Sequence, residues 1–127
     1  MGTRDVEVFR DAGRTLFSLG LVKGSEGNLS VYDGETLTIT RTGCKLTELG
    51  EADLVEGSLE RPPSGASSDL DVHVAYYRES GSGAVAHAHP PGTVPEGTPE
   101  PGEHGAYVFA ASLTEAVCLV VEGARTR

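Results

Sequence analysis

The sequence predicts one α/β domain, a layered sandwich in which helices pack on a mixed, largely antiparallel sheet. Stretches with the period of an amphipathic helix alternate along the chain with short runs that have the period of a strand. Two of these runs flank Asp33-Gly34, a two-residue turn that joins antiparallel strands. The length of 127 residues suits a single hydrophobic core. We therefore expect residues 1–127 to form one domain.

The first half of the chain supplies a helix and three strands. Residues 4–19 are expected to form the helix, because apolar side chains recur there at intervals of three and four and Gly20 follows. Strands are expected at residues 28–32 and 36–40, on either side of the turn, and at residues 53–56. These strands provide the antiparallel part of the sheet.

The next helix and strand follow a loop. Ser67 or Ser68 can cap the helix, which ends before Gly81. Residues 84–89 then form a short apolar strand. Residues 90–103 contain five of the seven prolines in the chain, so this segment is expected to be a linker.

The chain closes with a strand and a helix. Residues 106–110 are apolar and rich in strand-forming types, and Ser112 or Thr114 can cap a helix that ends near Arg125. Cys118 lies in an apolar run and is expected to be a small core residue.

The composition excludes several classes of partner. A net charge of −9 disfavours nucleic acid and anionic membranes, which bind basic surfaces. No secretory signal opens the sequence, and no apolar run approaches the length that spans a membrane. A cytoplasmic location is the expectation that follows.

The strongest chemical signal is the pair His87 and His89, which lie two positions apart on the predicted strand. Side chains at i and i+2 leave the same face of a strand, so both imidazoles would point the same way. Neutral imidazole is a common ligand of zinc and related metals, and His104 could complete a three-histidine site with an open position. The alternatives are a hydrogen-bonded surface pair and, for His104, a loop residue in an acidic stretch.

Asp69 is the candidate acid or base, because it lies in the first turn of a helix beside Ser67 and Ser68. Its alternative role is simply that of a helix-start carboxylate, which the helix dipole favours in any protein. His73 lies one turn further on. We leave it out of the predicted site, because a histidine in the middle of a helix is more often packed or hydrogen-bonded.

Backbone N–H groups in turns can hold an oxyanion, and hydroxyl or amide side chains nearby add donors. On its own, each of these segments is simply a turn and does not indicate a function. The three turns that could contribute are Gly27-Asn28, Thr42-Gly43 and Ser67-Ser68.

Five stretches resemble, in order, the motifs of the class II aldolase/adducin family. They are GLVKGSEGNLSV at 20–31, ITRTG at 39–43, ASSD at 66–69, AVAHAHPP at 84–91 and HG at 104–105. The resemblance implies a three-layer α/β/α sandwich. It also implies a homo-oligomer, such as a tetramer, with sites at subunit boundaries.

The resemblance assigns a role to each candidate residue. It implies Zn²⁺, or another divalent metal, held by His87, His89 and His104, and it places Asp69 where the family has a glutamate that ligates the metal or moves a proton. It implies that the three turns form a pocket for the phosphate of a small phosphorylated sugar or aldehyde. The implied reaction is reversible carbon–carbon cleavage through a metal-stabilised enediolate.

Departures from the family pattern keep three functions open. The segment between the second histidine and the His-Gly motif is short, the chain ends at Arg127 without the usual tail, and an aspartate replaces the glutamate. These departures put the family's tyrosine proton donor in question. The first function is an aldehyde-lyase, the second a dehydratase or epimerase of sugar phosphates, and the third a catalytically reduced metal-binding or assembly protein.

Overall fold

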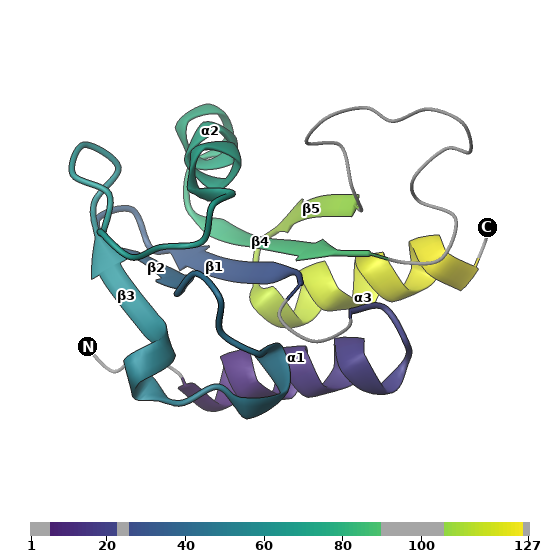
Figure 1. The fold of residues 1–127 in the computed structure, drawn as a ribbon. Helices are drawn as coiled ribbons and strands as arrows, with labels where there is room; N and C mark the ends of the chain where they lie inside the picture. The colour runs from purple at the N-terminus through teal and green to yellow at the C-terminus, as the bar shows by residue number, and fades with distance from the viewer. Residues whose placement is uncertain (1–5, 23–25, 90–105, 126–127) are drawn as a thin grey trace, which may run out of the picture.

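The computed structural model describes residues 6–22, 26–89 and 106–125, which form a five-stranded sheet with helices on both faces (Figure 1). Each helix and strand expected from the sequence is present within a few residues of its expected ends. In chain order the elements are α1 (Val6–Ser18), β1 (Asn28–Tyr32), β2 (Leu37–Thr40), the 3-10 turns η1 (Leu46–Glu48) and η2 (Glu51–Asp53), β3 (Leu54–Gly57), α2 (Leu70–Ser80), β4 (Gly83–Ala88), β5 (Ala106–Ala110) and α3 (Leu113–Arg125).

The strands pair in the order β3-β2-β1-β4-β5, and all four pairings are antiparallel. The expected largely antiparallel sheet is confirmed, but the parallel pairing that a mixed sheet would contain does not occur among these five strands. The connections give the reason. A tight turn joins β1 to β2, whereas α2 carries the chain from the β3 edge across the sheet to β4, which runs beside β1 in the opposite direction.

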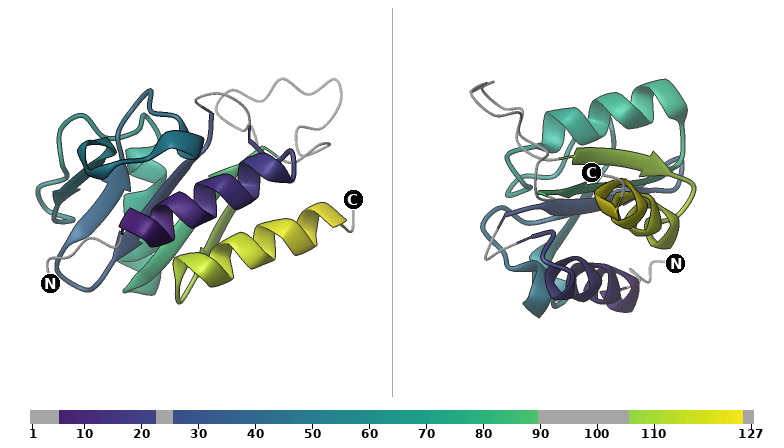
Figure 2. Two further views of the ribbon diagram at one scale, coloured as in Figure 1. Left: turned by 90° about the horizontal axis from the view of Figure 1, so that it is seen from below. Right: turned by 90° about the vertical axis from the view of Figure 1, so that its right-hand side faces the viewer.

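Helices cover both faces of the sheet, which confirms the three-layer arrangement (Figure 2). On one face, α1 and α3 pack against Ala84, Ala86 and Ala88 of β4. On the other face, α2 packs against Val85 of the same strand. Because successive strand residues point to opposite faces, His87 also points to the α2 side. The predicted ligand strand therefore directs its histidine side chain toward the helix that follows the Ser67-Ser68 turn.

Helix α1 approaches the η1 turn closely at Gly13. A Cβ atom at this position would lie 2.1 Å from the carbonyl oxygen of Leu46 and 3.0 Å from its Cβ. Both are too close for unbonded atoms, and the oxygen belongs to the backbone and cannot rotate away. Leu46 is itself fully buried, so the absence of a side chain at residue 13 lets α1 and η1 share one core.

The start of α3 confirms one of its two expected caps. The Ser112 hydroxyl oxygen accepts a hydrogen bond from the backbone N–H of Glu115, at 3.1 Å. The prediction that Cys118 lies in the core was wrong, because this residue is exposed. Ala116 and Val120 face the core, and a residue two positions from Ala116 lies on the opposite side of a helix.

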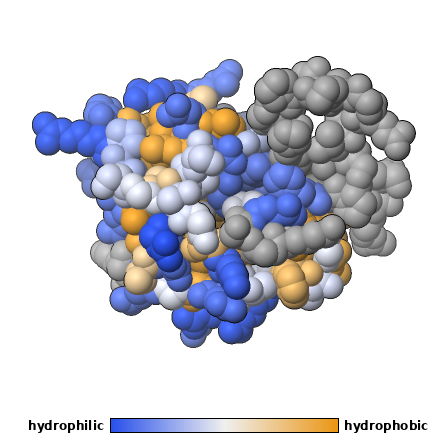
Figure 3. All heavy atoms as spheres, viewed as in Figure 1, coloured by the Kyte–Doolittle hydropathy of each residue, from blue (hydrophilic) through white to orange (hydrophobic). Residues whose placement is uncertain are grey.

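The surface shows no sign of a membrane span in the part of the chain that the structure describes. No helix there is long and apolar enough to cross a bilayer. Hydrophilic residues cover much of the face seen in Figure 3, with hydrophobic residues between them.

We expect Gly13→Ala to lower the free energy of unfolding by about 1 to 3 kcal/mol, because the new methyl group overpacks the contact with Leu46. Gly123→Ala is the matched control, since a Cβ at that α3 position meets nothing within 4 Å. The control should gain up to about 1 kcal/mol from helix propensity. Urea unfolding of both variants measures the difference, and equal effects would contradict the close approach.

Candidate active site

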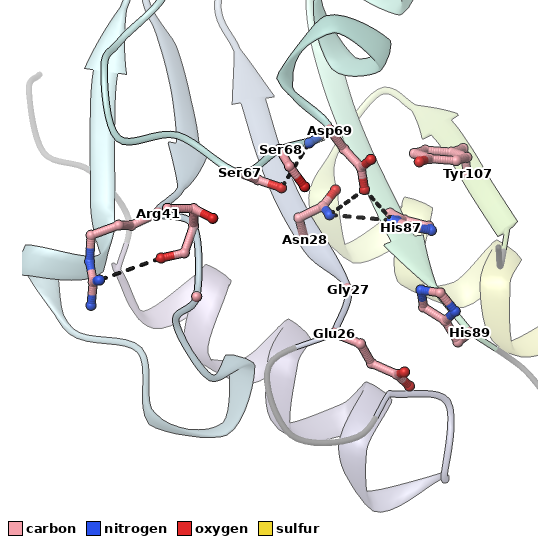
Figure 4. Close-up of a pocket in the computed structure, with 12 residues that line it drawn as sticks. Glu26, Gly27, Asn28, Arg41, Ser67, Ser68, Asp69, His87, His89 and Tyr107 are labelled. Carbon is pink, nitrogen blue, oxygen red and sulfur yellow. Dashed lines mark hydrogen bonds and ion pairs between the residues drawn. The ribbon is translucent and has the colours of Figure 1, made fainter. Parts of the chain in front are cut away.

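A pocket of about 410 Å³ lies at the edge of the sheet where β1 begins and β4 ends (Figure 4). Nine of the ten residues predicted for the site line it. The tenth, His104, lies outside the described residues. The pocket wall also contains Glu26, Arg41 and Tyr107, which the sequence analysis did not single out.

Two predicted turns that are distant in sequence lie side by side in this pocket. An isolated antiparallel bridge pairs Arg41 with Ala66, next to the turn Thr42-Gly43 on one segment and the helix start Ser67-Ser68 on the other. The bridge extends the sheet by one step beyond β2 and holds the two turns against each other. The structure thus places the two turns, which the family resemblance groups, beside each other at one pocket.

Only part of the expected amide donors is available in these turns. The N–H groups of Thr42 and Ser67 donate to backbone carbonyl oxygens of the facing segment, at 2.9 and 3.0 Å. These two N–H groups are therefore already paired within the protein. Within the described residues, the N–H groups of Gly43 and Ser68 make no such bond. The Thr42 and Ser67 side chains still line the pocket.

Gly27 lets the loop before β1 approach β4, the strand that carries His87. Its φ of +87° is in the left-handed region that favours glycine. A Cβ atom here would lie 3.0 Å from the carbonyl oxygen of His87 and 2.8 Å from the Val22 side chain. The backbone of Gly27 therefore forms a wall of the pocket where no side chain would fit.

His87 on β4 and His89 just after this strand lie close together, as their spacing in the sequence predicts. The ring centroids of His87 and His89 are 4.7 Å apart. The backbone N–H of His89, which follows the strand, donates to the carbonyl oxygen of Leu21 at 2.7 Å and so ties the strand end to the loop after α1. Tyr107, the cross-strand partner of His87 on β5, stacks on the His87 ring with centroids 4.0 Å apart.

The spacing of the two imidazole rings is compatible with a shared divalent metal. Two imidazoles on one tetrahedral ion, with nitrogen–metal distances near 2.0 to 2.1 Å, have ring centroids about 5 Å apart, close to the observed 4.7 Å. Across residues 6–22, 26–89 and 106–125, no group of three or more His, Cys, Asp or Glu side chains could hold a metal. The third ligand that the resemblance implied, His104, lies outside those ranges.

Asp69 contacts one of these histidines directly. Its Oδ2 atom lies 2.9 Å from Nδ1 of His87 and accepts a hydrogen bond from Nδ2 of Asn28 at 2.8 Å (Figure 4). Its side chain makes no cap bond to the helix that follows. Asp69 does lie at the start of α2, but its side chain contacts Asn28 and His87 instead of the helix backbone. A carboxylate on one ring nitrogen orients an imidazole so that the other nitrogen can ligate a metal.

The surroundings of Asp69 favour its ionised form. Partial burial acts to raise the pKa of Asp69, but the Asn28 amide, His87 and the Tyr107 hydroxyl outweigh it, so the pKa lies below the usual value. Asp69 is thus a carboxylate at neutral pH, held by donors from three different elements.

Asn28 is held from its other end by His73, the histidine that the sequence analysis left out of the site. Nε2 of His73 lies 2.5 Å from Oδ1 of Asn28. His73 is fully buried, and burial lowers its pKa to about 3, with the nearby His87 contributing. Its expected role as a packed, hydrogen-bonded residue is correct, but its partner is a residue of the pocket.

Sequence signals for the overlooked residues were weak. Tyr107 begins an apolar strand, and its place opposite His87 depends on which strands pair. Arg41 stands inside the ITRTG motif, yet its guanidinium is paired with Asp53 at 2.5 Å and is therefore not an isolated cation. Glu26 falls in a glycine-bearing loop that has no periodicity.

Residues 7–95, more than half of the chain, match the family described as Class II Aldolase and Adducin N-terminal domain. The chain belongs to the class II aldolase and adducin family. The resemblance stated from the five motifs is confirmed. This membership agrees with the arrangement of the pocket, in which the motif residues of the described chain converge.

Two curated proteins are similar in sequence to part of this chain. The 5-methylthioribulose-1-phosphate/5-deoxyribulose-1-phosphate aldolase of Rhodospirillum rubrum is 38% identical over 85 residues, which is 64% of this chain and 38% of that protein. A probable bifunctional methylthioribose-1-phosphate isomerase/methylthioribulose-1-phosphate dehydratase of Nocardia farcinica is 36% identical over 87 residues, covering 61% of this chain and 15% of that protein.

A solved structure agrees with both the fold and the sequence match. The crystal structure of L-fuculose-1-phosphate aldolase from Thermus thermophilus superposes with a TM-score of 0.64 at 40% identity, covering 68% of this chain and 45% of that one. In each of the three comparisons, the match spans less than half of the relative's length.

We expect the stability of the protein to fall between pH 7 and pH 5 because of His73. Its pKa drops from 6.5 to about 3 on folding. Between pH 7 and pH 5, His73 therefore becomes protonated in the unfolded chain but stays neutral in the native state. Stability therefore decreases as the pH falls, by about 2 kcal/mol for this group alone. Urea unfolding of wild type and His73→Gln at both pH values isolates the effect, and parallel pH dependences would contradict the assigned pKa.

Proposed function

We propose that this chain carries a metal-dependent aldehyde-lyase site that cleaves or forms a carbon–carbon bond in a small phosphorylated sugar. The observation that carries the proposal is one pocket in which a pair of imidazoles, an ionised carboxylate and two backbone turns face the same space. These are the parts that such a reaction needs: a metal site, a group that moves a proton, and donors for an anion.

The phosphate group would bind at the paired turns. The N–H groups of Gly43 and Ser68 and the hydroxyls of Thr42 and Ser67 supply hydrogen-bond donors without a net charge. Such donors suit a chain whose net charge is −9, because a neutral cradle lets an anion bind without a basic patch.

The sugar carbons would lie between these turns and the histidines. A divalent metal such as Zn²⁺, held by His87 and His89 with His104, would supply Lewis-acid stabilisation of the negative charge on the substrate oxygens. Asp69 would accept or return the proton that moves as the bond breaks or forms. Its contact with His87 supports this role, because a metal held by His87 would lie near this carboxylate.

The printed names of the relatives narrow the substrates to test. The Rhodospirillum rubrum aldolase and the Nocardia farcinica dehydratase both name methylthioribulose 1-phosphate. Cleaving such a ketose phosphate between its third and fourth carbons gives dihydroxyacetone phosphate and an aldehyde. We propose 5-methylthioribulose 1-phosphate, 5-deoxyribulose 1-phosphate and L-fuculose 1-phosphate as the first substrates.

The second candidate is a sugar-phosphate dehydratase, favoured by the 36% identity to the Nocardia farcinica protein. Proton transfer next to a carbonyl is common to both reactions, and the same Asp69 would perform it. The products differ, since a dehydratase keeps the carbon chain whole and releases one water. An epimerase would change neither the mass nor the chain length. A metal-binding protein without turnover is the remaining possibility from another class.

We expect the purified protein to contain about one divalent metal ion per chain and to release an aldehyde from one of the three ketose phosphates. Elemental analysis followed by product mass spectrometry on the same sample tests this. His87→Ala and His89→Ala should each lose the tight metal, because each removes a ligand. Unchanged metal content in these variants would refute the site, and metal without turnover would favour the noncatalytic protein. Sedimentation of the same sample tests the expected homo-oligomer.

We expect Asp69→Asn to lower kcat by about 10²-fold or more, since general acid and base groups contribute about 10² to 10⁴. The amide keeps the shape of the carboxylate but cannot move the proton. Asp71→Asn is the matched control, two residues along and exposed on α2, and its activity should equal that of wild type. Full activity in Asp69→Asn would mean that another group transfers the proton.

A further inference from the structure

A buried column of polar side chains runs from the α2 side of the core to the pocket. Its members, in order, are Tyr77, Ser30, His73, Asn28 and Asp69, joined by consecutive hydrogen bonds. Ser30 and His73 have no exposed surface, and Tyr77 has 1%. Burying polar groups is unfavourable unless every group is paired, and no buried side-chain nitrogen or oxygen of the described residues lacks a partner.

The direction of each hydrogen bond follows from the chemistry of the groups. The Asn28 Oδ1 atom only accepts, so Nε2 of His73 must carry the proton that joins them at 2.5 Å. Since His73 is neutral at pH 7, its Nδ1 atom has no proton and accepts one from the Ser30 hydroxyl, at 2.6 Å. The Ser30 oxygen then accepts from the Tyr77 hydroxyl at 2.7 Å.

The column fixes the Asn28 amide in one orientation. With Oδ1 facing His73, the amide nitrogen faces Asp69 and donates to its Oδ2 atom at 2.8 Å. The reversed amide would set its oxygen against the Asp69 carboxylate and its N–H₂ against the His73 N–H, which opposes like groups at both ends. The same Asp69 oxygen contacts Nδ1 of His87 at 2.9 Å, so the amide orientation determines how the carboxylate meets the ring.

We propose that His73 is a positioning residue of the site, which holds Asn28 so that Asn28 holds Asp69 against His87, with Ser30 and Tyr77 satisfying the other ring nitrogen of His73. The inference rests on the proposed function for its consequence in catalysis, but not for its geometry. It also gives Asn28 a role in orienting the carboxylate in addition to the phosphate contact that the resemblance implied.

Packing alone does not account for this column. A leucine at residue 73 could fill the same space between α2 and the sheet without burying polar atoms. Four successive hydrogen bonds instead lead from the core to a residue of the pocket wall, and each has one allowed direction. Partners that orient a metal ligand in this way typically change metal affinity or activity by 10- to 100-fold when removed.

The test compares two substitutions of one residue. His73→Gln keeps a donor near the position of the histidine Nε2 atom, while His73→Leu fills the volume without a donor. We expect His73→Leu to weaken Zn²⁺ binding by about 10- to 100-fold, measured by competition with a chromophoric chelator. His73→Gln should restore affinity to within a few-fold of wild type. The proposal also predicts that kcat falls in His73→Leu while KM changes little. Equal Zn²⁺ affinity in all three proteins would overturn the proposal.

A second measurement needs neither metal nor substrate. Long-range ¹⁵N–¹H correlation spectra of the metal-free, histidine-labelled wild type should show His73 as the neutral tautomer with its proton on Nε2. Tyr77→Phe removes the first donor of the column. This variant identifies the His73 signals, because only they should shift strongly among the histidine signals. A proton on Nδ1 would overturn the proposal, even if the protein proves to be an active lyase. The expected tautomer in a protein without turnover would support the positioning role while the proposed function failed.

Discussion

The antiparallel ladder between β1 and β4 is the constraint on which the site depends. Its register sets Asn28 directly opposite His87, and the two meet Asp69 from the start of α2 in one cluster of hydrogen bonds. A shift of one residue in this ladder would turn His87 toward α1 and α3, away from Asp69. The site therefore inherits its geometry from strand pairing at the centre of the sheet and not from a loop.

Three elements contribute to the same cluster because the α2 crossover returns the chain to the middle of the sheet. The bridge between Arg41 and Ala66 fixes where the crossover begins, and the β1 ladder fixes where it ends. Between them, α2 places His73 over β1 and Asp69 at the pocket. The start of α2 thus joins the turn Ser67-Ser68 to the histidine end of the pocket.

The electrostatic design of the pocket agrees with an acidic chain. The Arg41 guanidinium is already paired with Asp53, whose pKa is lowered first by the Gly50 N–H and then by this pairing. The backbone N–H groups and hydroxyls of the two turns that line the pocket carry no net charge. The carboxylate of Asp69 stays ionised because the Asn28 amide, His87 and the Tyr107 hydroxyl lower its pKa by more than partial burial raises it.

Much of the fold was predictable because periodicity and turn chemistry are local. The Asp33-Gly34 hairpin formed as expected: the Asp33 carboxylate accepts the N–H groups of the two residues after Gly34, at 2.8 and 2.7 Å. The side of α3 that faces the core was predicted wrongly, because a run of apolar residues does not indicate which side of a helix is buried. Cys118, expected in the core, is exposed. Family motifs brought the turns of the pocket together, which spacing alone could not.

By itself, the sequence determined the residue types of the site and the common face of His87 and His89, because a strand alternates its side chains whatever surrounds it. Only the tertiary structure decided the roles of Tyr107 and His73. Tyr107 reaches His87 because β5 pairs with β4, and His73 reaches Asn28 because α2 lies over β1. The Asp69 side chain likewise meets His87 because the fold brings the start of α2 to the end of β4. Each of these contacts joins residues far apart in the chain. They form through the packing of whole elements, which a local sequence pattern does not predict.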